Sequence, residues 1–330
     1  MRLVIDKYEA FTDKKIKKPL KIVLISDTHL AKNKMLFEKI NLRSTLKGIE
    51  KIKSIDFFVL DGDYVNTAKD YLDNDTFNFF VDFIKKLAKI APVIMVRGNH
   101  DLYFRTNRTD ETYRQLQKLD NVTLLENEQI DFLGLRITAF LPPRESFHAT
   151  KYGRHSMLIS HEDFKKKHFV FNEEDFNLVL THSPLSLSNK YMEEKSKDFF
   201  KKCDVVLSGH MHNGLIFSRN LEWIVKMLKN ENSKNPFKKT TKRYADSGFW
   251  YVYKTFFLIR GCRGARYFGL NNNTVYLPSS KEYSPLKLYD HKNESVQIIT
   301  KAVNKYAVIP FYVGRPSVVE LKITPITPKN

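Results

Sequence analysis

Five short motifs rich in aspartate and histidine lie between residues 27 and 212. They read Asp27-Thr28-His29, Gly62-Asp63, Gly98-Asn99-His100-Asp101, Thr181-His182 and Gly209-His210-Met211-His212. Each motif alone is weak evidence, because Asp-x-His and Gly-Asp also occur in ordinary turns. Together they offer carboxylates and imidazoles, which suit divalent Mn, Fe, Zn or Co. The set exceeds the needs of one ion and predicts two metals, about 3.5–4 Å apart, that share one carboxylate.

All five motifs stand directly after short apolar segments. Such segments, rich in Val, Ile, Leu and Phe, predict strands buried on both faces, and helix-like stretches separate them. The predicted strands are 21–26, 56–60, 92–96, 176–180 and 203–207, and the predicted helices are 36–54, 75–90, 112–119 and 192–201. This alternation predicts an α/β core. Ligands of such folds bind beyond the carboxyl ends of the strands, where all five motifs are expected.

The character of the sequence changes after Gly214. We predict a short helix at 221–228 and strands at 248–259, 274–278, 295–300 and 318–323. No repeat or Gly/Ser linker divides the chain, so we predict one domain over residues 1–330, with an insertion or lid at about 214–261. Aromatic and basic residues alternate in this insertion, a pattern that can grip nucleic acid or rest on an anionic bilayer. A lid packed on the core, with a solvated basic loop, explains the same residues.

Composition narrows the class of protein. Hydrophobic residues make up 42% of the 330 positions, which is enough for a sizeable core. Only Cys203 and Cys262 are present, so a disulfide framework is not expected. The N-terminus lacks the apolar centre of a signal peptide, and no apolar run is long enough to cross a bilayer. We therefore expect a cytoplasmic protein without an obligate protein partner, and a peripheral position at a membrane stays open.

The formal net charge of +18 has two explanations. It can mark an anionic partner, such as nucleic acid, a phosphorylated small molecule or an anionic membrane surface. It can also reflect coding DNA whose base composition favours lysine, asparagine and isoleucine codons. The charge by itself does not choose between the two.

In kind and in chain order, the five motifs resemble those of the calcineurin-like metallophosphoesterase superfamily, over about Ile22 to His212. The resemblance implies an α/β fold, a four-layer α-β-β-α sandwich of two mixed sheets, with the metal site at the carboxyl ends of the strands. It further implies a ligand scheme: Asp27, His29 and His212 for the first metal, Asn99, His182 and His210 for the second, and Asp63 as the bridge. His100 matches the catalytic histidine of the family, and Asp101 matches its orienting carboxylate.

This chain departs from the family pattern in two places. Many members carry a second acid a few residues after Gly-Asp, where this chain has Asn66, so the support of the site is expected to differ. The last motif reads Gly-His-Met-His-Asn-Gly rather than the Gly-His-Thr-His-Gly-Gly common in bacterial relatives. The strand expected after Pro316 is similar to the closing strand of the membrane-associated bacterial phosphodiesterase branch.

The resemblance implies a metal-dependent phosphoester hydrolase. A hydroxide bridging the two metals would attack phosphorus, and His100 would protonate the leaving oxygen. We expect Mn as the metal, with Fe, Zn or Co as alternatives, and a small or lipid-borne phosphodiester as substrate. A nuclease, or a non-catalytic module that binds anionic partners, is the alternative. Three arginines are candidate phosphate contacts, although the first could equally be a surface residue: Arg97, Arg263 and Arg266. The alternative for Asp101 is a cap of a helix or turn.

Overall fold

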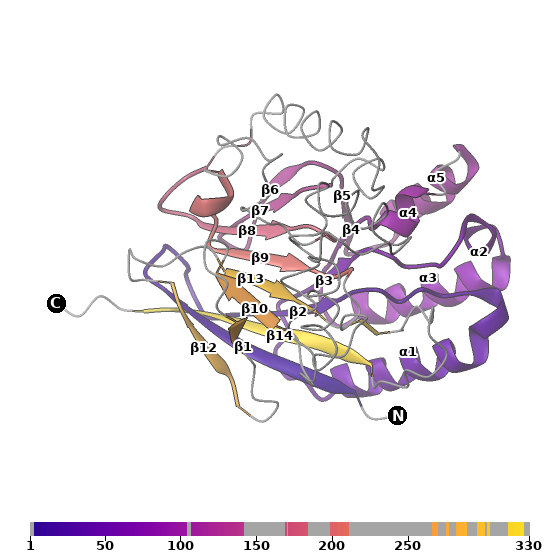
Figure 1. Ribbon diagram of the computed structural model, residues 1–330, viewed down its shortest axis with the longest axis horizontal. Helices are drawn as coiled ribbons and strands as arrows, with labels where there is room; N and C mark the ends of the chain where they lie inside the picture. Colours follow the sequence, from indigo (N-terminus) through magenta and orange to yellow (C-terminus); the bar gives the residue numbers. More distant parts are fainter. Residues whose placement is uncertain are drawn as a thin grey trace, which may run out of the picture.

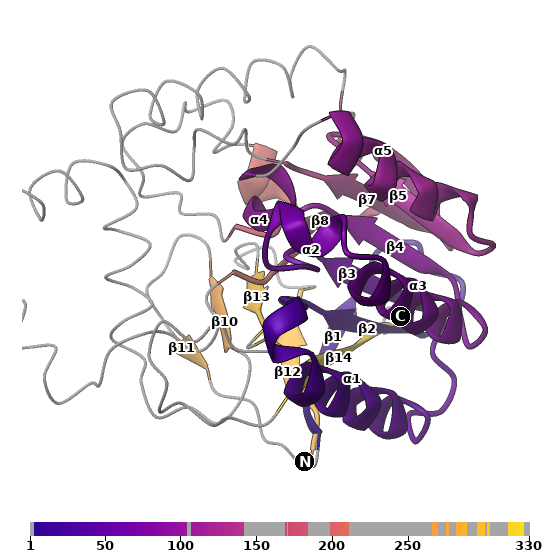
Figure 2. The ribbon, with the colours of Figure 1, turned by 90° about the vertical axis from the view of Figure 1, so that its right-hand side faces the viewer.

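The computed structural model shows two seven-stranded β-sheets packed face to face, with helices on the outside (Figures 1 and 2). The α/β sandwich of two mixed sheets is thereby confirmed. The structure describes residues 3–103, 107–141, 169, 171–183, 199–210, 266–269, 275–276, 282–288, 296–300, 302–303 and 316–326.

The first sheet is mixed. In spatial order its strands are β12 (Ser284–Lys287), β1 (Val4–Thr12), β14 (Ser317–Pro325), β2 (Leu20–Ile25), β3 (Phe57–Asp61), β4 (Val93–Val96) and β5 (Val122–Leu125). β2 to β5 are parallel to one another. β14 runs antiparallel to β2 and parallel to β1. The carboxyl ends of β2, β3 and β4 therefore meet at one edge, where three of the motifs begin.

The second sheet contributes the other two motifs. Its strands are β11 (Val275–Tyr276), β10 (Arg266–Gly269), β13 (Val296–Ile299), β9 (Val205–Ser208), β8 (Phe176–Leu180), β7 (Leu135–Ala139) and β6 (Gln129–Phe132). β7, β8, β9 and β13 are parallel, and β6 and β10 pair with this group in antiparallel fashion. β8 and β9 lie side by side, so the motifs that follow them are neighbours.

Alternating side chains build the layers of the sandwich. On β2, Ile22 and Leu24 pack between the two sheets, whereas Val23 and Ile25 pack under the helices. On the outer face of the second sheet, Val179 packs with the helical residue Phe200. Because successive side chains of a strand point to opposite faces, strands with apolar residues at every position can be buried on both sides.

The helices cover the outer face of the first sheet. They are η1 (Lys32–Lys34), α1 (Met35–Ile49), α2 (Ala68–Tyr71), α3 (Asn74–Ala88), α4 (Asn99–Tyr103), α5 (Asn107–Arg114) and η2 (Gln115–Lys118). α3 begins where the Asp73 carboxylate accepts the Thr76 N–H at 3.1 Å, an N-cap that satisfies a free backbone donor of the first turn. No helix in the described part of the chain is both long and apolar enough to cross a bilayer.

Most predicted elements are present, with ends shifted by a few residues. The strand predicted at 176–180 is β8 itself, and the helix predicted at 112–119 is split into the end of α5 and η2. The strands β1, β5, β6, β7, β10 and β12 were missed, and β1 was missed although its burial alternates along most of its length. Elements predicted at 221–228 and 248–259, and most of 192–201, lie outside the described residues. The single domain with an insertion at about 214–261 stays a prediction.

Candidate metal centre

The turns that follow β2, β3 and β9 hold their polar side chains on unusual backbone. Asp27, His29, Asp63 and His210 have φ values of 56°, 38°, 54° and 66°. Residues other than glycine rarely adopt this left-handed conformation, and such strain concentrates at functional sites. Backbone hydrogen bonds hold the first two turns together, because the His29 N–H donates to the Asp63 carbonyl oxygen at 2.9 Å.

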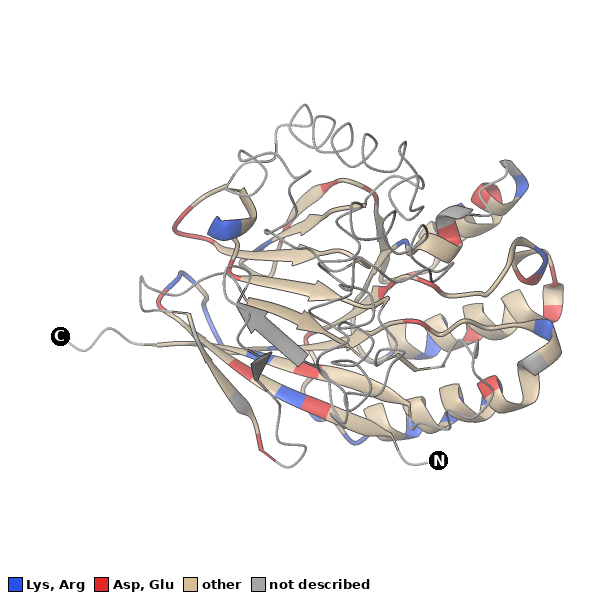
Figure 3. Cartoon of the chain, in the orientation of Figure 1, with Lys and Arg blue, Asp and Glu red and all other residues tan. Residues whose placement is uncertain are grey.

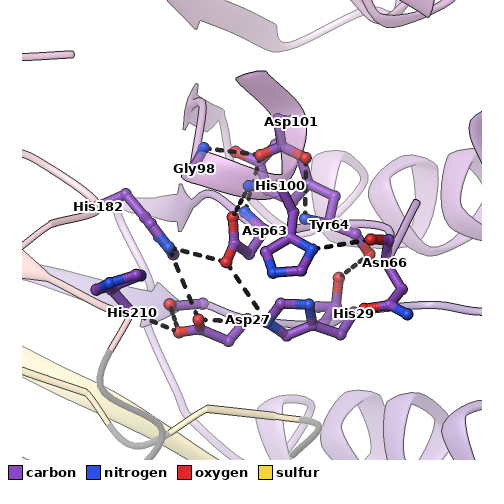
Figure 4. Close-up of polar contacts among 12 residues, drawn as sticks. Asp27, His29, Asp63, Tyr64, Asn66, Gly98, His100, Asp101, His182 and His210 are labelled. Atoms are coloured by element: carbon purple, nitrogen blue, oxygen red, sulfur yellow. Dashed lines mark hydrogen bonds and ion pairs between the residues drawn. The ribbon is translucent and has the colours of Figure 1, made fainter. Parts of the chain in front are cut away.

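The side chains of the five motifs converge from both sheets (Figure 4). The Nε2 atom of His29 lies 3.6 Å from Asp27 Oδ1 and 3.5 Å from Asp63 Oδ2. The Nε2 atom of His182 lies 3.1 Å from the same Asp63 oxygen and 3.8 Å from Asp27 Oδ1. His210 lies beside His182, with ring centroids 5.3 Å apart. One carboxylate, that of Asp63, thus stands between imidazoles contributed by the two sheets.

Two groups of side chains within this cluster could each hold a metal ion. His29, Asp63 and His100 form one group, and Asp63, His182 and His210 form the other, with the ligand atoms of each group within 4.8 Å of one another. Only Asp63 belongs to both. A carboxylate shared by two ion sites is the arrangement expected of a dinuclear centre.

Buried polar atoms test whether the site suits a metal. The Asn99 side-chain oxygen is buried and has no hydrogen-bond partner among the described residues, and the buried His182 Nε2 atom faces the carboxylate oxygens of Asp63 and Asp27. A buried polar atom without a partner costs free energy. Both atoms belong to predicted ligands, and an amide oxygen and an imidazole nitrogen can each donate a lone pair to a divalent ion. The residues therefore fit the metals that the motifs imply.

Charges are coupled across the cluster. Burial by itself would raise the pKa of the Asp63 carboxyl, but the imidazoles of His182, His29 and His100 hold that pKa below its ordinary value. Burial would lower the pKa of His182, but the carboxylates of Asp63 and Asp27 raise it well above its ordinary value. Without metal, protons on the imidazoles would balance the carboxylates.

Asp101 links the second and third motifs instead of contacting His100. One carboxylate oxygen accepts the N–H groups of Asp63 at 2.8 Å and Gly98 at 2.7 Å. The other accepts the Tyr64 N–H at 3.2 Å and the Tyr71 hydroxyl at 2.6 Å. The prediction that Asp101 orients the catalytic histidine is therefore corrected, because its acceptor sites are engaged by four other donors.

The group that orients His100 is the backbone of Asn66. His100 Nδ1 lies 2.8 Å from the Asn66 carbonyl oxygen (Figure 4). Because a carbonyl only accepts, Nδ1 carries the proton in this arrangement, and Nε2 is the atom available for proton transfer. The His100 ring also packs edge-on against His29, with centroids 4.7 Å apart. The missing second acid of the family pattern is thus replaced by a main-chain acceptor.

Two glycines allow the motifs to approach each other. Gly62 has a φ of 76°, which side chains rarely tolerate. A Cβ at this position would lie only 2.8 Å from His182 Nδ1 and would clash with it. A Cβ at Gly98 would collide with the backbone and carboxylate of Asp63. The glycines of the Gly-Asp and Gly-Asn-His-Asp motifs are therefore needed for close packing as well as for turning the chain.

Asp61 belongs to the site but was missed from the sequence. Burial raises the pKa of its carboxyl well above the ordinary value, His182 lowers it, and Asp27 and Asp63 raise it further. The backbone N–H of Gly209 also lowers the pKa of the Asp61 carboxyl. The hydrogen bond of this N–H is to the His182 carbonyl oxygen, at 3.1 Å. Both carboxylate oxygens lack a hydrogen-bond partner within the described residues. The sequence did offer a signal for Asp61, because this acid is the last residue of β3, a strand that is buried at every position.

The candidate phosphate contacts fare differently. Arg97 is 1% exposed, and its guanidinium pairs with Asp110 at 2.6 Å and with Glu126. It also lies 3.9 Å from the ring centre of Tyr113. These partners give Arg97 a structural role, and we do not retain it as a substrate contact. Arg266 begins β10. Arg263 and the predicted ligand His212 lie outside the described residues.

Comparison with known proteins identifies the family. Residues 20–214, more than half of the chain, match the calcineurin-like phosphoesterase family. The chain therefore belongs to this family.

The matches to curated relatives span only part of the length of each relative. The chain is 28% identical over 244 residues to an uncharacterized metallophosphoesterase of Campylobacter jejuni, covering 71% of this chain and 55% of that protein. It is 36% identical over 88 residues to a probable cyclic nucleotide phosphodiesterase of Fibrobacter succinogenes, covering 26% of this chain and 32% of that protein. The chain thus spans about half or less of the length of these relatives.

Solved structures resemble the chain weakly. A phosphopantetheinyl hydrolase from Mycobacterium tuberculosis has a TM-score of 0.38 at 15% identity, covering 60% of this chain and 84% of that chain. A 5'-nucleotidase precursor from Thermus thermophilus has a TM-score of 0.30 at 13% identity, covering 59% and 42%. Scores this low carry no argument about activity.

Proposed function

We propose that this chain hydrolyses phosphoesters at a dinuclear metal centre and that its substrates are phosphodiesters of small molecules or lipids. The observation that carries the proposal is the position of Asp63, which belongs to both groups of metal-binding side chains. The proposed ligands are Asp27, His29 and His212 for one ion, Asn99, His182 and His210 for the other, and Asp63 for both. We assign His100, which stands in one of the two groups, to proton transfer and not to metal binding. We expect Mn, with Fe, Zn or Co as alternatives.

Two divalent ions held here would supply a hydroxide nucleophile at neutral pH and stabilise negative charge on the phosphoryl oxygens. The residues of the chain have supporting tasks. Asp101 fixes the turn that presents Asp63 against the turn of Gly98. The Asn66 carbonyl holds the Nδ1 proton of His100, so that Nε2 can deliver a proton to the leaving oxygen.

Preference for diesters is the finer part of the proposal. One relative is named as a probable phosphodiesterase, which supports it. His100 would supply the proton that a poorly leaving alkoxide needs, and this role is the same for a monoester and a diester.

The test compares two chromogenic substrates with the purified chain loaded with Mn. We expect faster hydrolysis of bis-p-nitrophenyl phosphate than of p-nitrophenyl phosphate, and hydrolysis of both to be at least about a hundredfold slower in Asp63→Asn. Faster cleavage of the monoester would overturn the diester preference. Metal-loaded protein that cleaves neither substrate but retains DNA or RNA in a salt-sensitive manner would favour the non-catalytic binding module. Cleavage of nucleic acid alone would favour the nuclease.

A further inference from the structure

The first turns of α1 expose three large apolar side chains. Leu36 is 70% exposed, Phe37 is 69% exposed and Ile40 is 42% exposed. Only three other large apolar residues in the described part of the chain are exposed: Leu72, Ile90 and Leu133. Isolated exposed apolar residues are normal, but a cluster within five positions of one helix marks an interaction surface.

These side chains cannot be core residues that failed to pack. The core-facing side of α1 is occupied by Leu42, Leu46 and Ile49, which are buried under the first sheet. At 100° per residue, Leu36, Phe37 and Ile40 project from the opposite side of the helix. Rotation of α1 to bury them would expose the core residues, so the apolar cluster needs a partner outside the described fold.

The cluster is attached to the metal-binding segment. The Leu30 N–H, next to His29, donates to the Tyr64 carbonyl oxygen at 3.0 Å. The Ala31 N–H donates to the Glu38 carboxylate on α1 at 2.6 Å. A partner bound to the first turns of α1 would therefore lie at the end of the molecule where the β2 and β3 motifs emerge.

Leu72 extends the apolar cluster beyond α1. It is 37% exposed and precedes Asp73, whose carboxylate pairs with the Lys32 ammonium at 2.8 Å. Lys32 lies just before α1, and its N–H also donates to the Asp70 carboxylate at 2.9 Å. The turn between α2 and α3 is thus fastened beside the start of α1.

The charges of α1 select the kind of partner. Exposed Arg43 and Lys47 continue the same solvent face towards the carboxyl end of the helix. The one acid of α1, Glu38, is buried and bonded to the Ala31 N–H. Figure 3 colours the basic and acidic residues of the chain in the orientation of Figure 1. An apolar cluster continued by basic residues suits the surface of an anionic bilayer. A second copy packed on the same face by a two-fold axis would oppose basic residues of like charge.

We propose that Leu36, Phe37 and Ile40 insert into the interface of an anionic bilayer and hold the metal centre beside the lipid headgroups. This inference deepens the proposed function and rests on it for the identity of the substrate, a lipid-borne phosphodiester. The docking itself needs no turnover, so it can be tested separately.

The experiment measures co-sedimentation of the full chain with vesicles of phosphatidylcholine alone or mixed with phosphatidylglycerol. We expect binding to the mixed vesicles and weaker binding to phosphatidylcholine. The triple variant Leu36→Ser, Phe37→Ser, Ile40→Ser should lose more than about tenfold in vesicle affinity, because three apolar side chains no longer enter the interface. The matched control, Ile90→Ser with Leu133→Ser, removes two exposed apolar residues elsewhere and should bind as the unchanged chain does.

A parallel assay of bis-p-nitrophenyl phosphate hydrolysis separates docking from catalysis. We expect the triple variant to keep the turnover of this soluble substrate, which also shows that it is folded. Equal vesicle binding by the unchanged chain and the triple variant would overturn the proposal, as would failure of the unchanged chain to bind anionic vesicles. A dimer in solution that the triple variant dissociates, without vesicle binding, would assign the surface to a second copy. Vesicle binding without any hydrolysis would sink the proposed function and leave the docking surface in place.

Discussion

The two sheets contribute to the metal centre in different ways. Side chains from the first sheet stand on turns cross-linked by buried hydrogen bonds, with four donors converging on Asp101 alone. Residues that follow strands of the second sheet are held by contacts with residues of the first sheet. The Nδ1 atom of His182 contacts the Asp61 carbonyl oxygen, and the His210 N–H donates to the Asp27 carboxylate at 3.1 Å. The half of the site that comes from the first sheet is therefore arranged by its own hydrogen bonds, whereas the half from the second sheet is positioned by contacts with the first.

This difference has a consequence for metal binding. The first-sheet half keeps its hydrogen bonds whatever occupies the site, because they join backbone donors to a carboxylate that is not a predicted ligand. The second-sheet half is positioned by the contacts of His182 with Asp61 and Asp63 and of His210 with Asp27. Bound metals would add bonds between the halves, so metal binding should order the turns of the second sheet more than those of the first.

The largest expected effect comes from the residue that both halves share. Asp63→Asn should lower the affinity for Mn and the turnover of bis-p-nitrophenyl phosphate by at least about a hundredfold each, because a bridging ligand is lost. Isothermal titration calorimetry and the colorimetric assay measure these effects. Asp131→Asn removes a carboxylate that is 72% exposed and serves as the matched control. Two metals retained by Asp63→Asn would contradict the bridging role.

The next largest effect separates chemistry from metal binding within the first half. His100→Ala should keep both metals and lose roughly 10²–10⁴-fold in kcat on an alkyl phosphodiester, because proton delivery to the alkoxide is removed. The loss should be smaller on bis-p-nitrophenyl phosphate, whose p-nitrophenolate leaves without a proton. Asn66→Ala keeps the main-chain carbonyl and should lose less than about tenfold. Metal analysis and steady-state kinetics check both variants. A loss for Asn66→Ala as large as for His100→Ala would show that the Asn66 side chain, not its backbone, supports the histidine.

Asp101→Asn tests the hydrogen bonds of the first half directly. An amide can accept through only one of its two polar atoms, so N–H donors of Asp63, Tyr64 or Gly98 would be left facing an NH₂ group. We expect a loss of about 3 kcal/mol in the free energy of unfolding, measured with urea. The exposed Asp82→Asn is the control and should change stability little. Unchanged stability of Asp101→Asn would show that these bonds do not hold the turns.

Metal removal sharpens the comparison without a mutation. After chelation, amide hydrogen exchange should quicken in residues 180–183 and 205–210 more than in 61–66 and 98–101. The physical reason is that the second half loses its ties across the site, while the first half keeps its own. Mass spectrometry of the exchanged peptides measures both regions in one sample. Equal changes in the two regions, or a larger change in the first, would contradict the asymmetry.

The smallest expected effect concerns Asp73, which caps helix α3 on the outside of the first sheet. The Asp73 carboxylate has its pKa lowered to about 2, chiefly by its hydrogen bond to Lys32 and then by those to Thr76. Because its pKa is lowered, the Asp73 carboxylate stabilises the fold at pH values above 3.8, the ordinary pKa of the group. This stabilisation fades as the pH falls towards about 2. Asp73→Asn should therefore lower Tm slightly at pH 7, and the gap should close in acid. A constant gap across this range would contradict the charge contribution.

Much of the fold and most of the site could be predicted from local patterns. Apolar runs that end in Asp or His gave the strands of both sheets that carry the site, because burial on both faces demands continuous apolar residues. Chain order and residue type gave the candidate ligands, of which Asp27, His29, Asp63, His182 and His210 lie together. β1 escaped notice because it pairs with β14, more than 300 residues away, and its neighbours cannot be read from its own residues.

The sequence by itself determined which chemistry the site can offer, since ligand types and their place at strand ends are local properties. Tertiary structure alone decided how each polar group is used. Asp101 was read as the partner of His100 but binds four other donors, and Arg97 was read as a phosphate contact but is buried between two carboxylates. The physical reason is that a hydrogen bond depends on the distance and direction of groups brought together by folding, and spacing along the chain specifies neither.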